Sequence, residues 1–504
     1  MKRKFLLYTA LSGMLILTTT GCGDSFLQTK PTDSVGSSEM TDNELNISSL
    51  LNGTYKKMMA YNGAESTNHD DASYVSWVMK NEVRGLDMII KRARSRWYAW
   101  DYEFDEPSRL ANDYHSRVIW QYAYAIIKNC NVVIEATKGL SPDSYKSYNG
   151  QAKVIRAMMY HQLVRMYQKS YRLNPEAAGV PLILLPPSAN FSEDKDAKGR
   201  GKLSEVYTQM VQDLNDAIDV LTNARTSKGY INKQVAYGFL ARVQSDMAYA
   251  GTDNGFQNAL WDKVIDNAQA ACEGLGIMDR ASWELGFNDN SNKDWIWGFV
   301  NDSQGNTGYP GFFSFIDRRS GRTGYQNVRV DKAFIDLFDE SDVRKLFMQE
   351  PGSKEEDNEY CPLKFMDNSL KTGHIPMMRV SEMVLIQAEA YANKGELQKA
   401  QDKLDELRAK RIEGYVNEAP AATRNDMLER IWKERRKELY GEGFAMTDIL
   451  RLGFIVNGEK ATRSKYHGLW VVKDLKDNDN RFIFQIPVEE LNANPLITDK
   501  DQNP

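Results

Sequence analysis

Apolar residues recur at three- and four-residue steps over much of this chain, and this period constrains its fold more than any other feature. The clearest series comprises Leu203, Val206, Tyr207, Met210, Leu214, Ile218 and Leu221. In an α-helix this spacing places every member on one face, so the segment predicts an amphipathic helix of about five turns. The same period recurs over residues 155–166, 235–247 and 261–272.

Two neighbouring apolar series predict a helical hairpin. Residues 380–391 and 397–407 each show the helical period, and Gly395 interrupts it between them. Small side chains at Ala388 and Ala400 allow two antiparallel helices to approach closely. Hairpins of this kind stack into one continuous scaffold.

The fold expected from these series is mainly α: a tetratricopeptide-like scaffold of helical hairpins with long loops and a few short strands. No strict repeat of fixed length is visible, so insertions must separate the hairpins. Leu385 lies in an apolar run and is expected to be buried. Residues 282–371 differ in character, because Trp295–Val300 predicts a short strand and a Gly-rich, aromatic stretch continues to Tyr325.

The N-terminus has the form of a bacterial lipoprotein signal. Basic residues at positions 2–4 precede an apolar stretch, and small residues lead to Cys22. This pattern predicts a signal peptide over residues 1–21 and a lipidated Cys22, although Thr19 stands where the lipobox usually has Leu. Plain secretion is the alternative. Residues 22–43 are polar and are expected to form a tether, and no later segment approaches the roughly 20 apolar residues of a membrane-spanning helix.

Charge and cysteine content exclude some classes of protein. The 64 Lys and Arg are interspersed with 69 Asp and Glu, which gives a net charge of −5. Nucleic acid is therefore not an expected partner. Cys130, Cys272 and Cys361 are too widely spaced for a disulfide framework or a metal knuckle, so we expect separate thiols.

Catalytic and cofactor motifs are absent from the sequence. It contains no HExxH, GxxxxGK[ST] or GxSxG motif and no strand-associated GxGxxG. The histidines show no ligand spacing, and His161 is expected to be structural. Carboxylate pairs such as Asp70 and Asp71 do not by themselves show the separation that glycoside hydrolysis needs. Asp477 and Asp479 are expected to lie in a solvated turn and not in a calcium loop. We therefore expect no enzyme, no cofactor and no metal.

Several spaced segments together resemble the starch-utilisation D / RagB (SusD/RagB) family of outer-membrane lipoproteins of Bacteroidota. They are Cys22-Gly-Asp-Ser-Phe-Leu27 with Pro31, Trp120–Asn131, Ala152–Tyr160 with Val180-Pro-Leu182, Arg379–Ala390, Leu404–Arg411, Glu434–Phe444 with Asp448 and Arg451, and Ile486-Pro487 with Asn494-Pro495. Their order along the chain matches the family as well as their content.

The resemblance implies a tetratricopeptide-like scaffold with a variable loop face, in two regions (44–280 and 281–504) packed as one unit. It also implies a lipid-anchored, surface-exposed protein of the outer membrane that caps a TonB-dependent (SusC-like) transporter. The motif residues Arg156, Glu382, Glu389, Arg435 and Glu438 are charged positions on helices. We interpret them as ion-pairing partners between packed hairpins and not as ligand contacts.

The resemblance favours a glycan as the ligand, with a peptide as the alternative ligand. A third alternative is that the protein is a surface-anchored glycosidase. Aromatic rings offer flat apolar faces suited to sugars. Candidate ligand contacts are the aromatic residues of two loop-rich regions, Trp77, Trp97, Tyr98 and Trp100 in the first and Tyr309, Phe312, Phe313 and Tyr325 in the second. Arg94 and Arg96 are candidate hydrogen-bond donors beside the first. The alternative is that these rings fill small loop cores.

Overall fold

The computed structural model describes residues 43–504, apart from 61–62, 65, 72, 188–196, 251–257, 302–310, 322–323, 368–371 and 459. The expected signal peptide, Cys22 and most of the tether lie outside the described residues, as does Tyr309. Helices dominate the rest, and the strands are short. The predicted mainly α fold is confirmed.

The predicted helical series are helices in the structure. The α-helices are α2 (Glu44–Met59), α3 (Tyr74–Val83), α4 (Ala99–Glu103), α5 (Tyr114–Ala136), α6 (Pro142–Tyr167), α8 (Leu203–Val220), α9 (Lys233–Ala248), α10 (Asn258–Ala271), α11 (Arg280–Trp283), α12 (Phe312–Ile316), α13 (Lys332–Ile335), α14 (Val380–Asn393), α15 (Leu397–Arg408), α16 (Arg424–Leu439), α17 (Ala445–Asp448), α18 (Phe454–Asn457) and α19 (Val488–Ala493). Shorter turns of helix are η3 (Pro107–Arg109), η4 (Thr137–Gly139), η5 (Glu355–Asp357), η6 (Ile449–Gly453), η7 (Asn480–Phe482) and η8 (Asp499–Asp501).

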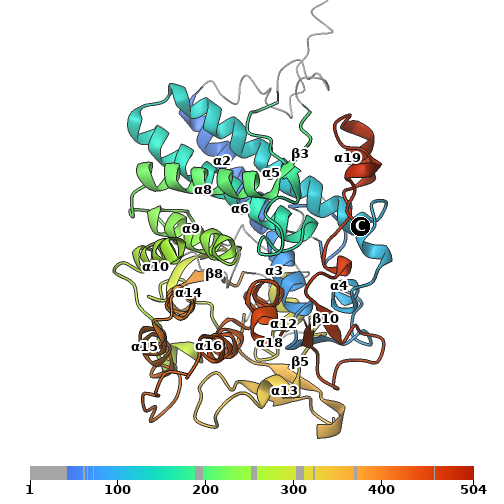
Figure 1. Cartoon of the computed structure of the whole chain (residues 1–504), viewed down its shortest axis with the longest axis vertical. Helices are drawn as coiled ribbons and strands as arrows, with labels where there is room; N and C mark the ends of the chain where they lie inside the picture. Colours follow the sequence, from blue (N-terminus) through green and yellow to red (C-terminus); the bar gives the residue numbers. More distant parts are fainter. Residues whose placement is uncertain are drawn as a thin grey trace, which may run out of the picture.

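The long helices pack in sequence order. Helix α5 packs on α6, α6 on α8, α8 on α9, α9 on α10, α10 on α14, and α14 on both α15 and α16. Figure 1 shows this series descending the left side of the molecule, with α13, β5 and β10 below it and to its right. Because consecutive helices are neighbours, the scaffold is a stack of hairpins with the irregular segments on one side.

The strands form small antiparallel sheets beside this stack. They are β1 (Met88–Ile90), β2 (Ala178–Pro181), β3 (Arg200–Lys202), β4 (Trp295–Phe299), β5 (Val328–Val330), β6 (Phe347–Gln349), β7 (Tyr360–Pro362), β8 (Ile375–Arg379), β9 (Lys460–Thr462) and β10 (Asp474–Lys476). One sheet has the order β1-β5-β7-β6, and β2-β3, β4-β8 and β9-β10 form pairs. Strand β1 comes from the first half of the chain and β5 from the second, so this sheet joins the two.

The hairpin of α14 and α15 has the geometry that its sequence predicts. Gly395 lies between the helices with φ +78°, a left-handed conformation that glycine adopts without steric cost. Leu385 is fully buried on α14, as expected, and so are Ala388 and Ala400 on the facing surfaces. Ser381 lies in the first turn of α14. Its main-chain N–H and its hydroxyl group both donate hydrogen bonds to the carboxylate of Asp294, which thereby caps the helix.

The charged motif residues form buried ion pairs between elements, as the sequence interpretation held. Arg156 on α6 pairs with Asp213 on α8, Glu382 on α14 with Arg242 on α9, and Arg435 on α16 with Asp448. Glu389 on α14 pairs with Arg451 on η6. Because both partners of each pair are largely withdrawn from water, removing one partner leaves an uncompensated buried charge.

A larger ionic network lies beneath the C-terminal helices. Its members are Asp294, Asp342, Arg344, Lys364, Arg379, Arg411, Glu434, Glu438 and Glu442. Glu438 on α16 contacts three guanidinium groups, those of Arg344 at 3.1 Å, Arg379 at 3.0 Å and Arg411 at 2.9 Å. Six separate stretches of the chain, from Asp294 to Glu442, meet in this network. It therefore fixes how α14, α15 and α16 pack.

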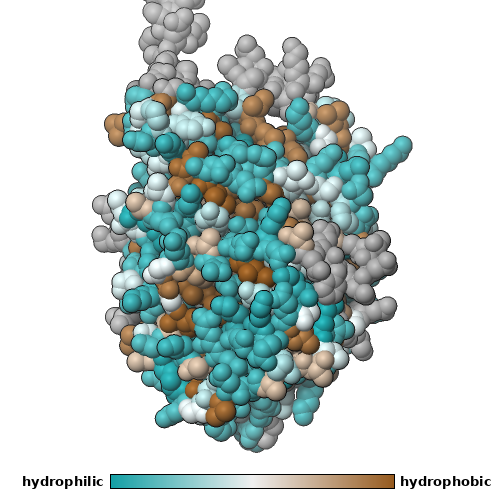
Figure 2. Space-filling view, turned by 60° about the vertical axis from the view of Figure 1, so that its left-hand side comes forward, coloured by the Kyte–Doolittle hydropathy of each residue, from teal (hydrophilic) through white to brown (hydrophobic). Residues whose placement is uncertain are grey.

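No helix in the described part of the chain is long and apolar enough to cross a membrane. Figure 2 shows one face of the molecule, on which hydrophilic residues predominate and apolar residues form separate patches.

Candidate functional site

The loop that follows β1 carries the strongest candidate for ligand contact, Trp97. Asn327, a buried residue next to β5, holds this loop. Its side-chain amide donates a hydrogen bond to the carbonyl of Trp97 (3.0 Å), and its main-chain carbonyl accepts one from the Lys91 N–H (2.8 Å). The N–H of Tyr98 donates to a carboxylate oxygen of Asp70 (3.1 Å). Two other segments of the chain, around Asn327 and Asp70, thus set the position of Trp97.

Three partly exposed rings from different segments contact one another, and we call His69, Trp97 and Tyr325 the ring cluster. The imidazole of His69 is stacked on Trp97 with centroids 4.8 Å apart, and Tyr325 meets Trp97 edge to face at 6.5 Å. The Tyr325 hydroxyl and His69 Nδ1 share a hydrogen bond. Because each ring is fixed by the other two, the cluster is preorganised before any ligand arrives.

Buried rings support the ring cluster from below. Phe315 on α12 is stacked on Tyr325 at 4.9 Å, and Tyr98 meets Phe315 edge to face at 4.9 Å. The structure therefore joins the two regions nominated from the sequence, because Trp97 and Tyr98 come from the first and Tyr325 from the second.

Left-handed backbone conformations flank two rings of the cluster. Tyr98, directly after Trp97, has φ 63°, and Gln326, directly after Tyr325, has φ 49°. A non-glycine residue in this region costs on the order of 1 kcal/mol or more and persists only where the surroundings impose it. Backbone strain of this kind is common at binding sites, so it supports the ring cluster as a candidate functional site.

Trp100 lies beside the cluster on α4 and is half-buried. The guanidinium groups of Arg92 and Arg96 lie over its ring, at 5.3 and 5.5 Å from the centroid. Arg92 is also paired with Glu103. Trp100 thus makes cation–π contacts with two arginines and is not part of the ring cluster.

Arg94, nominated as a hydrogen-bond donor, is paired with Glu350. Arg318 and Arg329 also contact this carboxylate, at 2.7 and 2.9 Å. Burial disfavours the charged form of Glu350, but a hydrogen bond from Cys361 and these three guanidinium groups outweigh burial and hold the pKa of Glu350 below its usual value. Arg94, Arg318 and Arg329 are therefore paired within the protein.

For four nominated aromatics the structure shows the alternative, rings that fill the core. They are Trp77, Tyr98, Phe312 and Phe313, each at most 3% exposed. Trp77 belongs to α3, which is buried along its whole length, and its ring packs between Tyr74 and Tyr122. These rings support the loops and do not present a face to solvent.

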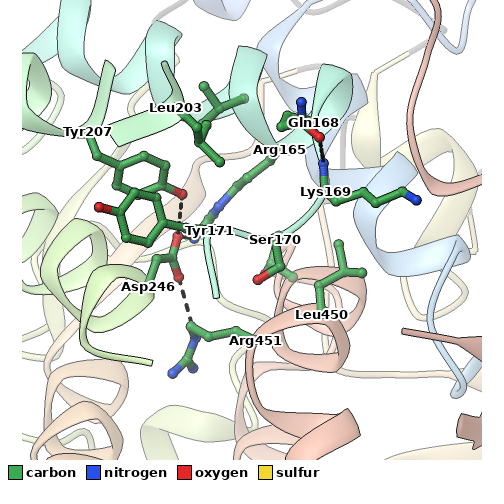
Figure 3. A pocket seen from close by; sticks show the side chains of 12 residues that line it. Arg165, Gln168, Lys169, Ser170, Tyr171, Leu203, Tyr207, Asp246, Leu450 and Arg451 are labelled. Atoms are coloured by element: carbon green, nitrogen blue, oxygen red, sulfur yellow. Dashed lines mark hydrogen bonds and ion pairs between the residues drawn. The ribbon is translucent and has the colours of Figure 1, made fainter. Parts of the chain in front are cut away.

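A small cavity lies between the end of α6, α8, α9 and η6, and Figure 3 shows the side chains that line it. Its volume is about 30 Å³, enough for a water molecule but not for a sugar ring. Asp246 lies beside it and is contacted by Tyr207 at 3.3 Å and Arg165 at 3.1 Å. We interpret this cavity as part of the packing between hairpins.

The buried imidazole of His161 should make the stability of the protein sensitive to acid. Its Nε2 lies 2.8 Å from Asp246, yet burial and then the charge of Arg165 lower its pKa from 6.5 to about 4, with Arg242 acting in the same direction. The unfolded chain therefore binds more protons between these pH values, and the free energy of unfolding falls by about 3 kcal/mol as pH drops from 6.5 to 4. His161→Gln should remove this dependence in pH-dependent melting curves. An unchanged acid slope would contradict the assignment.

A larger open groove lies between the starts of α2 and α6 and the α8–α9 connection. Its volume is about 670 Å³, and Tyr148, Tyr230 and Arg225 are among its lining residues. Sequence reasoning did not identify it. Tyr148 is hydrogen-bonded to Glu44, and Tyr230 meets Tyr55 edge to face at 5.3 Å. Among the described residues Tyr148 and Tyr230 make no ring contact with each other, so the groove lacks the preorganised rings of the cluster.

His69 was missed by the sequence analysis. It contacts Trp97, 28 positions away, and Tyr325, 256 positions away, so no local pattern indicates its role. The structure alone reveals it.

The stacked helical hairpins and the ring cluster on inserted loops define a helical-repeat protein that carries its candidate binding site outside the repeats. Two protein-family models match the chain. The model described as starch-binding associating with the outer membrane (SusD-like) matches residues 25–244, and the model of the SusD family (SusD and RagB) matches residues 349–504. The protein belongs to the SusD/RagB family.

Solved structures share this fold along nearly their whole length. A SusD-like carbohydrate binding protein from Bacteroides vulgatus is 24% identical with a TM-score of 0.76, and the match covers 91% of this chain and 98% of that one. A SusD superfamily protein from Bacteroides thetaiotaomicron is 22% identical (TM-score 0.75, 92% and 100% covered). Surface glycan-binding protein A from Bacteroides fluxus is 20% identical (TM-score 0.70, 92% and 99% covered). A comparison with curated protein sequences finds no significant match.

Proposed function

We propose that this protein is a surface glycan-binding protein that holds oligosaccharide on the ring cluster of His69, Trp97 and Tyr325. The observation that carries the proposal is the mutual contact of these three partly exposed rings. A flat indole face stacks on the apolar face of a sugar ring, while the imidazole and phenol supply polar atoms at its edge. The names of two related structures, a carbohydrate binding protein and a surface glycan-binding protein, support a glycan ligand.

A peptide ligand is the alternative, and the charges near the ring cluster disfavour it. Capture of peptide termini requires charged groups that can turn toward the ligand. Arg94, Arg318 and Arg329 instead converge on Glu350. We therefore propose binding of a largely uncharged ligand, without chemical conversion.

Binding to parallel panels of oligosaccharides and peptides tests the ligand class. Purified wild-type protein should retain one or more oligosaccharides and no peptide, and Trp97→Ala should lose that retention. Retention of peptides alone would favour the alternative. A double variant, Tyr148→Ala with Tyr230→Ala, tests the groove beside α2. If this double variant loses glycan retention and Trp97→Ala keeps it, the groove is the binding site instead.

In the cell we propose that the protein is held at the outer membrane by a lipid on Cys22 and acts as a lid for a TonB-dependent, SusC-like transporter. The matched family description, which includes association with the outer membrane, supports this location. A ligand held on the loop face could then be passed to the transporter barrel. Co-purification of a transporter with the intact protein from solubilised outer membranes would test this partnership.

Lipid anchoring predicts that Cys22→Ala will move the protein from the membrane fraction to the soluble fraction. The thiol of Cys22 is the acceptor of the lipid, so the variant has no attachment point. Fractionation and the intact mass of the wild type provide the measurement. A wild-type protein without acyl mass, together with a variant that still sediments with membranes, would refute the anchor.

A further inference from the structure

Three buried side chains outside the ring cluster place ligand atoms together. Asp70 and Asp71 lie on the loop between α2 and α3, and His115 lies in the first turn of α5. One ligand atom from each residue lies within 4.8 Å of the other two. Asp70 is 1% exposed, Asp71 is 3% exposed, and the His115 side chain is 12% exposed.

Polar atoms of this group have no hydrogen-bond partner in the described structure. They are Oδ1 of Asp70, both carboxylate oxygens of Asp71, and Nε2 of His115. A buried carboxylate or imidazole nitrogen without a partner is costly, so a set of them facing one another requires an explanation. The ammonium group of Lys80 accounts for only part of this arrangement. Its ammonium lies 3.1 Å from Oδ1 of Asp71, without hydrogen-bond alignment, and 2.7 Å from Asp101.

The charges of this region are unbalanced. The carboxylates of Asp70, Asp71 and Asp101 are all buried and face the ammonium of Lys80, and Asp101 also faces the guanidinium of Arg84. With a neutral imidazole at His115, one negative charge remains uncompensated. Lys80 contacts Oδ1 of Asp71, which leaves Oδ2 directed toward His115 at 3.6 Å from Nε2. A divalent cation between these atoms would compensate the remaining negative charge.

The orientation of His115 fits a metal ligand. Its Nδ1 lies 2.8 Å from Asp113, so Nδ1 carries the proton and donates it to this carboxylate. In the neutral imidazole the lone pair of Nε2 then points toward Asp71. A carboxylate that orients a histidine in this way is the usual second partner of a metal-bound imidazole. Two ligands of one zinc ion lie about 3.3 Å apart, close to the separation of Nε2 and Oδ2.

We propose that Asp70, Asp71 and His115 bind one divalent transition-metal cation, for which Zn²⁺ is the best match. Two carboxylates and an imidazole suit zinc, whereas calcium prefers six to eight oxygen ligands. The site was not foreseen from the sequence, because His115 is far from Asp70 and Asp71 along the chain.

The cation also has a structural consequence for the ring cluster, and this part rests on the proposed function. Asp70 accepts the N–H of Tyr98, the residue after Trp97, and His69 is the residue before Asp70. A metal that fixes Asp70 to α5 therefore fixes both rings of the stacked pair. We expect glycan affinity to fall severalfold when the metal is removed.

Metal binding is tested on full-length, tag-free protein that has been treated with chelator and then titrated with ZnCl2. Calorimetry and elemental analysis should give one equivalent of zinc for the wild type and for His374→Ala, a control at a histidine elsewhere. His115→Ala and the near-isosteric Asp71→Asn should bind zinc on the order of 100-fold more weakly or not at all. Zinc should also raise the melting temperature of the wild type but not of Asp71→Asn.

No zinc uptake by the wild type, or equal uptake by folded Asp71→Asn, would overturn the site. Titration with MnCl2 and CaCl2 in parallel should show weaker binding, and calcium as the tightest ion would overturn the assignment of a transition metal. Because these measurements involve no glycan, they stand or fall independently of the ligand proposal. Equal glycan affinity with and without zinc would overturn only the positioning role.

Discussion

Leu385→Asp should destabilise the protein by at least about 4 kcal/mol. The side chain of Leu385 is fully buried in the middle of α14, the helix that packs against α9, α10, α15 and α16. The substitution removes a large apolar side chain from the core and places a carboxylate there without a partner, and each of these changes costs several kcal/mol. Thermal or denaturant melting followed by circular dichroism measures the effect.

An exposed leucine provides the matched control. Leu469 is 93% exposed, so Leu469→Asp should change stability by less than about 0.5 kcal/mol. If the Leu385 variant melts at the same temperature as wild type, α14 does not pack as the structure has it.

Glu438→Ala should cost about 3–5 kcal/mol, because it removes the carboxylate that three buried guanidinium groups share. Arg344, Arg379 and Arg411 all lie within 3.1 Å of this carboxylate. Burial opposes the charge of Glu438, yet Arg411 and Arg379 outweigh burial and hold its pKa well below the usual value. The carboxylate therefore stays charged at neutral pH. Its loss takes the nearest carboxylate from Arg411, whose guanidinium is otherwise 4.0 Å from Asp294.

The same helix offers a control for this second prediction. Glu429 on α16 pairs with Lys433, and both side chains are more than 40% exposed. Glu429→Ala should therefore cost less than about 1 kcal/mol. Equal melting temperatures for Glu438→Ala and Glu429→Ala would show that the buried ionic network does not hold the C-terminal helices together.

The helical scaffold could be predicted from the sequence because its helices are long and amphipathic. The α8 series and the hairpin interrupted at Gly395 follow a period that only a helix explains. The structural role of Glu438 could be inferred, but its meeting with Arg379 and Arg411 in one network could not. Pairing between segments that lie tens of residues apart leaves no trace in the local pattern.

The candidate site was predicted only in part, for a related reason. Trp97 and Tyr325 stand out as aromatics in loop segments, whereas their contact depends on how β1 and β5 pair. Trp77 was misjudged because polar residues surround it in the sequence. Those neighbours are themselves buried and paired, since Lys80 contacts Asp101 and Glu82 accepts the N–H of Gly441. A polar sequence therefore did not mean an exposed helix.

The central claim is that the ring cluster holds the glycan, and calorimetry on a folded Trp97→Ala variant tests it most directly. The titrant is the oligosaccharide that wild type retains from the panel. Stacking of a nucleic-acid base on one aromatic ring contributes roughly 1–3 kcal/mol, and a sugar ring should contribute a comparable or smaller amount, so we predict about a tenfold loss of affinity. Trp470→Ala, at a 70% exposed tryptophan outside the cluster, should bind like wild type. Wild-type affinity in Trp97→Ala, with its melting temperature unchanged, would contradict the account.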